Sequence, residues 1–232
     1  MKVAVCVSGA MTSQLPGRNL NRNLELLRAN FPDADFYFSS WTGYADKNIN
    51  EDVIYFDEPE IPYHPYADVI VDDPPPKLEK MIRQSRGEKP SPKFAHQTKQ
   101  ILGHCYLFDV IPQDYDVYVR ARWDTVTYSK AGFGTYLKDC FDNQIAIGFA
   151  TLGYNGFNRI QQADAHFHNR HLFDQLIMHP PSVLDTKKVY KLSEEKKLIA
   201  AEFGWWQALG GNGHRCMAGW ANPDRTVLDQ YL

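Results

Sequence analysis

Short apolar runs alternate with amphipathic stretches through the first quarter of the chain. The run from Lys2 to Val7 is continuous and rich in β-branched residues, which is typical of a strand buried on both faces of a parallel sheet. After a loop, a helix is predicted to begin at an Asn19 N-cap and to bury a stripe formed by Leu20, Leu24, Leu27 and Phe31. Strands follow at 34–40 and 53–56. This order predicts a doubly wound α/β sheet, in which ligands bind beyond the carboxyl ends of the strands.

The pattern is interrupted between residues 57 and 93, where eight prolines leave room for at most a short helix near 78–86. It then resumes with helices at 96–110, 165–178 and 193–210 and a strand at 144–149. In the first of these helices Ile101, Cys105 and Phe108 share one face. We therefore expect one domain over residues 1–232, with the Pro-rich segment as an excursion from it.

The stretch from Tyr115 to Asp124 carries the most informative polar pattern. As a strand, it places Arg120, Arg122 and Asp124 on one face and apolar side chains on the other. Burying these charges is costly unless something pairs with them. A central strand therefore predicts a cleft that holds phosphate, a metal ion or both, because guanidinium groups bind phosphate and a carboxylate can hold a bridging cation. An edge strand would instead present a solvated charged face with an internal Arg–Asp pair.

Amino-acid composition excludes few classes of function. The 232 residues carry 25 Lys and Arg against 28 Asp and Glu, so a formal net charge of −3 requires neither nucleic acid nor an anionic membrane as a partner. A basic cluster between Lys77 and Lys99 is either a solvated face or a contact for a polyanionic acceptor. The four cysteines are scattered, and no stretch is long and apolar enough to span a bilayer. We therefore expect a cytoplasmic protein without a membrane span, in which Cys6 and Cys105 are reduced core residues.

The loop from Ser8 to Arg18 lacks both established phosphate fingerprints, G-x-G-x-x-G and G-x-x-x-x-G-K-[ST]. Dinucleotide cofactors and P-loop chemistry are therefore not expected. Gly9 still lets a ligand approach the backbone closely, although an ordinary turn explains it equally well. Arg18 could reach a phosphate.

Three residues near the end of the chain are further candidates. Glu202 lies beside the apolar stripe of the last helix, where a carboxyl pKa can be raised or a sugar hydroxyl bound, and a surface ion pair is the alternative. Trp206 is a candidate stacking platform, whereas Trp205 is expected in the core. His214 could approach a diphosphate or donate a proton, or it could be structural.

A histidine-rich segment allows a different chemistry. His166, His168 and His171 have the spacing of the H-x-H-x-D-H run that holds zinc in metallo-hydrolases. Arg170 stands where that run carries its Asp, and a cation there opposes metal binding. A metal-dependent hydrolase is therefore kept as an alternative. Otherwise Asp164 or His166 lines a cleft and the other histidines lie on a helix surface.

Three stretches together resemble small bacterial and viral glycosyltransferases with a GT-A-type fold, namely Val3–Gly9, Phe36–Trp41 and Tyr115–Asp124. The resemblance covers about half of the chain. It implies an α/β fold with three α/β/α layers and a mostly parallel, Rossmann-like central sheet. It also implies an enzyme that moves a sugar from a nucleotide-sugar donor to an acceptor hydroxyl. A non-catalytic nucleotide-binding module is the remaining alternative.

The resemblance also implies roles for single residues. Asp124 would be a catalytic residue that holds Mn²⁺ or Mg²⁺, or contacts the donor diphosphate, with Arg120 and Arg122 nearby. Only one Asp stands where the family carries D-x-D, so Arg122 could supply the positive charge itself. The remaining implied positions are Ser8, Gly9, Arg18 and His214 at the donor, Glu202 and Asp164 as catalytic carboxylates, and Trp206 and His166 at the acceptor.

Neither the resemblance nor the candidate residues identify the acceptor. Surface polysaccharide is the default for such enzymes. A virus-encoded member could instead glycosylate a hydroxylated base of duplex DNA in an infected host cell. The near-neutral charge argues mildly against DNA, and the basic cluster between Lys77 and Lys99 argues mildly for it.

Overall fold

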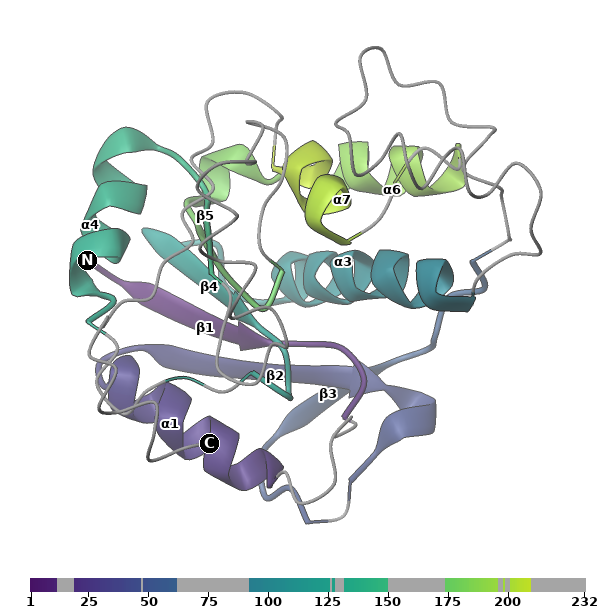
Figure 1. The fold of residues 1–232 in the computed structure, drawn as a ribbon, viewed down its shortest axis with the longest axis horizontal. Helices are drawn as coiled ribbons and strands as arrows, with labels where there is room; N and C mark the ends of the chain where they lie inside the picture. Colours follow the sequence, from purple (N-terminus) through teal and green to yellow (C-terminus); the bar gives the residue numbers. More distant parts are fainter. Residues whose placement is uncertain are drawn as a thin grey trace, which may run out of the picture.

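The computed structural model describes residues 1–11, 19–46, 48–61, 92–125, 127, 132–149, 174–195, 198 and 201–209. Within these ranges the chain forms a mixed α/β fold around a six-stranded, mostly parallel sheet (Figure 1). This confirms the α/β class and the mostly parallel sheet that the sequence predicts. Among the described helices, none combines the length and the apolar character needed to cross a membrane.

The sheet has the strand order β3-β2-β1-β4-β6-β5. Its strands are β1 (Val3–Val7), β2 (Asp35–Trp41), β3 (Val53–Phe56), β4 (Val117–Ala121), β5 (Ile147–Phe149) and β6 (Leu176–His179). The first four strands are parallel, and β6 runs antiparallel between β4 and β5. The registers pair Val7 with both Phe38 and Ala121, which fixes how the ends of β2, β1 and β4 line up.

The chain changes direction across the sheet between β1 and β4. It runs outward from β1 through β2 to β3 and then returns to β4 on the other side of β1. The carboxyl ends of β1 and β4 are therefore neighbours, and the Ser8 N–H donates to the Ala121 carbonyl at 3.0 Å. Reversal of strand order at this point is where open α/β sheets bind ligands.

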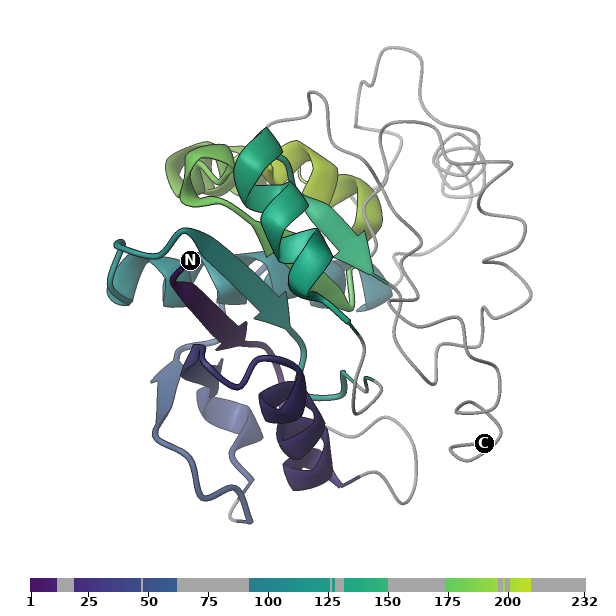
Figure 2. The ribbon, with the colours of Figure 1, turned by 90° about the vertical axis from the view of Figure 1, so that its left-hand side faces the viewer.

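Helices cover both faces of the sheet (Figures 1 and 2). They are α1 (Leu20–Asn30), α3 (Pro92–Val110), α4 (Gly134–Asn143), α6 (Thr186–Glu194) and α7 (Ala201–Ala208), with short 3-10 turns η1 (Thr42–Tyr44) and η3 (Pro181–Val183). Side chains of α1 and α4 share one hydrophobic core with one face of the sheet. Side chains of α3, α6 and α7 share the other.

Strand alternation divides the sheet residues between these two cores. Val5 and Val119 point towards α1, whereas Cys6 and Tyr118 point towards α3. All four are fully buried, so β1 and β4 are covered on both faces. The continuous apolar run of Lys2–Val7 is explained by this two-sided burial.

Several local predictions are confirmed. The Asn19 side chain caps α1 by accepting from the backbone N–H groups of Asn21 and Arg22, and the predicted stripe of that helix is buried. The predicted face of the 96–110 helix, formed by Ile101, Cys105 and Phe108, is buried in α3. That helix begins earlier than predicted, at Pro92, whose fixed φ suits a first helical turn.

The charged strand is shorter than predicted. β4 ends at Ala121, so Arg122 and Asp124 belong to the turn that follows it and not to the strand face carrying Arg120. The turn closes through hydrogen bonds between Arg122 and Thr125. The strand is nevertheless central, lying between β1 and β6.

Of two helices predicted in the second half, one is wrong and the other is confirmed only in part. Leu176 to Met178 belong to strand β6, because this apolar run fills the gap between β4 and β5; residues 165–173 lie outside the described ranges. Of the helix predicted from 193 to 210, the later part is confirmed as α7, whereas Ser193 and Glu194 end the preceding helix α6 and buried Leu198 lies between the two helices. Asp185 starts α6 by accepting from the Lys188 N–H at 3.0 Å.

The strand predicted at 144–149 is confirmed only in its second half. Gln144 takes a left-handed conformation, with φ of 50°, and ends α4, a helix that the sequence analysis did not predict. The strand β5 starts three residues later, at Ile147.

Candidate functional site

The turn after β4 is held rigidly by its own backbone and by β6. The Arg122 N–H donates to Thr125 Oγ1 at 2.9 Å, and the Thr125 N–H donates to the Arg122 carbonyl at 3.0 Å. The Thr125 hydroxyl then donates to the carbonyl of Gln175, at the start of β6, at 2.7 Å. Thr125, with 1% of its surface exposed, therefore joins the end of β4 to the start of the neighbouring β6.

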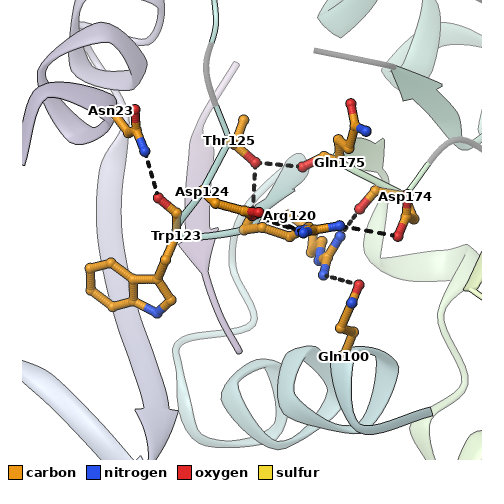
Figure 3. A network of polar contacts seen from close by, with 9 residues as sticks. Asn23, Gln100, Arg120, Trp123, Asp124, Thr125, Asp174 and Gln175 are labelled. Carbon is orange, nitrogen blue, oxygen red and sulfur yellow. Dashed lines mark hydrogen bonds and ion pairs between the residues drawn. The ribbon is translucent and has the colours of Figure 1, made fainter. Parts of the chain in front are cut away.

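The same turn is also anchored to α1 and β2. Asn23 of α1 donates from Nδ2 to the Trp123 carbonyl at 3.0 Å, and Trp123 Nε1 donates to the Ser39 carbonyl at 2.9 Å. Both donors are buried. Figure 3 shows this network joining α1, the turn and α3. The side chains of Arg122 and Asp124 therefore start from a fixed backbone at the carboxyl edge of the sheet.

Arg122 lies between two carboxylates. Its Nε and Nη2 donate to the two oxygens of Asp124 at 2.7 and 2.6 Å, and its Nη1 lies 3.6 Å from Asp174 Oδ2. The side chains are 19% exposed for Arg122 and 12% for each aspartate. The sequence analysis expected an internal Arg–Asp pair if this strand lay at the edge of the sheet. The pair is present, but β4 is a central strand. Asp174 was not predicted as a site residue.

Arg120, next to the last residue of β4, is completely buried on the face that α3 covers. Its Nη1 donates to the Asp174 carbonyl, its Nη2 donates to Gln100 Oε1 of α3 at 3.4 Å, and its guanidinium lies 5.0 Å from the centre of the Trp205 ring. Burial, helped by the charge of Arg122 and opposed by Asp174 and Asp124, lowers the pKa of Arg120 to about 9.

Buried polar atoms with no partner among the described residues gather on the same face. They include Ser8 Oγ, Ser39 Oγ, Thr98 Oγ1 and Arg120 Nε. Strand alternation places the two serines and the arginine on the α3 side, and Thr98 lies on α3 itself. Buried polar groups are normally hydrogen-bonded, so a cluster of such atoms at the end of the sheet suits a polar ligand.

The turn after β1 provides open backbone beside this cluster. Gly9 has φ of +108°, a conformation that strains any side chain, and a Cβ at this position would meet nothing within 4 Å. Ser8 and Gly9, predicted at the donor site, therefore lie next to the β4 turn.

A pair of buried histidines lies deeper under α3. His104 Nε2 and His179 Nε2 are 2.9 Å apart, and His179 Nδ1 lies 3.1 Å from the Pro180 carbonyl. Because a carbonyl can only accept, His179 Nδ1 carries the hydrogen, and the neutral His179 Nε2 accepts from His104. Burial lowers the pKa of His179 to about 4 and holds the pKa of His104 well below its usual value. Packing between Trp205 and His104, at 5.6 Å between ring centres, links this pair to Arg120.

The residues around Arg122 do not fit a bound metal ion as they are arranged. Both oxygens of Asp124 accept hydrogen bonds from the guanidinium, which occupies the space between the two carboxylates. Across the described ranges, no three His, Cys, Asp or Glu side chains gather in a group that could hold a metal. Among the described residues, the positive charges at this position are those of Arg120 and Arg122.

Several predicted site residues lie outside the described residues, namely Arg18, Asp164, His166, His168, His171 and His214. Glu202 lies in α7, but its side chain is outside the description too. Trp206 is half-buried in α7, whereas Trp205 is fully buried, as predicted for a core residue. Of the basic cluster, the structure describes the side chain of Lys99, which pairs with Glu58 at 3.0 Å.

No family model, curated protein or solved structure matches this chain. The functional argument therefore rests on the geometry of the β4 turn. Two arginines at the end of a central strand, buried hydroxyl groups beside them and an open glycine turn form a site suited to a phosphate-bearing polar ligand.

Sequence reasoning found Arg120, Arg122 and Asp124 but missed their partners. Asp174 and Gln175 precede the apolar run Leu176–Met178, which was assigned to a helix. The same signal that marked β4, polar residues directly next to a short apolar run, is present there. Gln100 and Thr98 carry no such local signal, because their part in the site depends on how α3 lies across the sheet.

Proposed function

We propose that this chain is a glycosyltransferase that moves a sugar from a nucleotide-sugar donor to an acceptor hydroxyl. The observation that carries the proposal is the charged turn Arg122–Thr125, fixed beside the Ser8–Gly9 turn where the strand order reverses. Nucleotides bind doubly wound sheets at such reversals. Guanidinium groups match the geometry and charge of a diphosphate.

The proposal includes a three-layer, Rossmann-like fold of GT-A type. It is supported by the four parallel strands β1 to β4, by the antiparallel β6 beside β4, and by the helices packed on both faces of the sheet. The resemblance of Val3–Gly9, Phe36–Trp41 and Tyr115–Asp124 to this class of enzyme points the same way.

The donor is bound across the ends of β1, β2 and β4. The diphosphate lies at Arg122, with the buried charge of Arg120 behind it. The hydroxyl groups of Ser8, Ser39 and Thr98 are the described groups placed to hydrogen-bond the hydroxyls of the nucleoside or sugar.

The reaction is a displacement at the anomeric carbon of the sugar. The bond from this carbon to the acceptor oxygen forms, the bond to the diphosphate oxygen breaks, and the diphosphate leaves with the electron pair. Arg120 and Arg122 stabilise the charge that develops on the leaving group. The acceptor proton passes to a carboxylate, for which we propose Glu202 or Asp164 on the basis of the family resemblance.

We propose a polysaccharide or a hydroxylated base of duplex DNA as the acceptor, and the cytoplasm as the place of reaction. Among the described residues Cys6, Cys105 and Cys140 are buried and unpaired, as in a reducing compartment. Binding to duplex DNA that weakens steeply with added salt would support the DNA acceptor, and no binding at low salt would exclude it.

A thermal-shift screen with UDP-, GDP-, CMP- and dTDP-sugars tests the proposal directly. We expect one donor base to raise the melting temperature, because a ligand that binds the folded state stabilises it by mass action. The Arg122→Gln variant should lose this response. Lys138→Gln, on the exposed surface of α4, should keep it and serves as the control.

Other results of the same screen would favour one of the two alternative functions, a non-catalytic nucleotide-binding module or a metal-dependent hydrolase. Stabilisation by a donor that is never consumed, with either class of acceptor, would indicate a non-catalytic binding module. No response to any donor, together with zinc in the purified protein, would indicate the hydrolase.

A further inference from the structure

Trp205 of α7 contacts two buried groups on the face of the sheet that α3 covers. The centre of its ring lies 5.0 Å from the Arg120 guanidinium and 5.6 Å from the centre of the His104 ring. All three side chains are completely buried. Trp205 therefore connects α7, the helix that carries Glu202, with the arginine that we place behind the donor diphosphate.

The His104 ring is fixed in turn by β6 and β4. Its Nε2 lies 2.9 Å from His179 Nε2, and the two rings stand at 88° to each other. The Tyr118 ring stacks on His179, with 5.8 Å between their centres. Four rings, from β4, β6, α3 and α7, therefore form a continuous buried support, and the Trp205 ring is the one that lies next to the Arg120 guanidinium.

An indole ring is a favourable neighbour for a buried cation. The face of an aromatic ring is electronegative, tryptophan gives the strongest attraction, and the attraction grows when water is excluded from the pair. Arg120 also donates to the Asp174 carbonyl and to Gln100 Oε1 (Figure 3). Its guanidinium is thereby held from three elements, β6, α3 and α7.

We infer that Trp205 is a positioning residue of the donor site, which holds the Arg120 guanidinium in place through the face of its indole ring. This inference rests on the proposed function. It goes beyond the core role that the sequence pattern predicts for Trp205, and it makes α7 part of the donor site. A substitution of Trp205 should therefore weaken diphosphate binding only while Arg120 is present.

A double-mutant cycle separates action through Arg120 from a general role in packing. The four proteins are the original chain, Trp205→Leu, Arg120→Met and the double variant. Arg120→Met should fold, because a buried charged group can often be replaced by an apolar one of similar size without loss of stability. Arg122 is present in all four proteins and keeps binding measurable. Isothermal titration with UDP, GDP, CDP and dTDP gives the affinities.

We expect one nucleoside diphosphate to bind the original chain. Trp205→Leu should bind it about tenfold more weakly, in line with the loss of a buried cation–π contact. Arg120→Met should lose at least as much, and the double variant should bind no more weakly than Arg120→Met. Phe31→Leu removes a similarly buried ring from the core on the other face of the sheet and should leave the affinity unchanged.

Trp205→Phe gives an independent reading of the same contact. It removes part of the indole volume but keeps an aromatic face, so it should bind the diphosphate several-fold more tightly than Trp205→Leu does. If Trp205→Leu does not fold, Trp205→Phe takes its place in the cycle, with a smaller loss that should again disappear in Arg120→Met.

Three results would overturn the inference and leave the proposed function intact. They are an unchanged affinity in Trp205→Leu, an equal weakening by this substitution with and without Arg120, and equal affinities of Trp205→Leu and Trp205→Phe. No binding of any of the four nucleoside diphosphates to the folded original chain would remove the proposed function together with the inference.

Discussion

Two histidines under α3 are buried as neutral rings. His104 and His179 share one hydrogen between their Nε2 atoms, and both are completely inaccessible to solvent. The rings that face them belong to Phe108, Tyr118 and Trp205, and the charge of Arg120 also disfavours protonation of His104. The pair is therefore stable only while both rings are uncharged.

This arrangement predicts a loss of stability in mild acid. The pKa of His179 is lowered from 6.5 to about 4 in the folded protein, so the unfolded chain binds protons first as the pH falls below 6.5. The contribution of His179 to the free energy of unfolding is then complete above pH 7 and should fall by about 2 kcal/mol by pH 5, and His104 should act in the same direction. Urea unfolding at pH 7.5, 6 and 5 measures this change.

A substitution at the same position checks the cause. His179→Gln should lose part of the decrease between pH 7.5 and pH 5, whatever its stability at neutral pH. Equal decreases in the variant and the original chain would show that other groups cause the acid sensitivity.

At the scale of elements, α3 is the structural support of the site. It contributes Thr98, Gln100 and His104 to the face of the sheet that carries Arg120. Its close approach depends on Gly103, where a Cβ would lie 3.1 Å from Cζ2 of Trp41. Trp41 is only 3% exposed and packs edge-on against Tyr106, so it has little room to move.

Alanine substitutions at two glycines test this packing. A Gly→Ala change inside a helix usually stabilises it by up to about 1 kcal/mol. We expect Gly103→Ala to lower the free energy of unfolding by about 1 kcal/mol, because crowding against Trp41 outweighs that gain. Gly134→Ala, at the start of α4 with nothing within 4 Å of its Cβ, should cause no loss. Chemical unfolding of both variants measures the two changes in the free energy of unfolding. A Gly103→Ala variant as stable as Gly134→Ala would contradict the packing argument.

The elements that sequence reasoning located have strong, long-range patterns. The continuous run of β1 and the capped, striped helix α1 each admit one interpretation, and both are confirmed. The four-residue run of β6 is too short to separate a strand from a buried helical turn by periodicity. The start of α6 carried a recognisable signal, because the N-cap residue Asp185 precedes an amphipathic stretch. The sequence analysis instead followed the apolar pattern from Ser193 onward and predicted one later, longer helix.

At the scale of the whole molecule, strand order brings the site together. Ser8 and Arg122 are distant in sequence but adjacent in space, because β4 pairs with β1 after the chain has formed the other edge of the sheet. Sequence reasoning predicted the arginines, because charges beside an apolar run are unusual. It did not predict Asp174, because the apolar run that follows was assigned to a helix and not to a strand paired with β4.

Hydrogen–deuterium exchange with the donor that gives the largest thermal shift tests the central claim most directly. Binding at the ends of β1 and β4 should slow exchange at the amides of Ser8–Gly9 and Arg122–Thr125, which lie side by side in the fold. Exchange in α6, on the outer side of α3, should stay unchanged and serves as the internal control. Slower exchange confined to β3 or α6, with both turns unaffected at a saturating donor concentration, would contradict a nucleotide-sugar site at the strand reversal.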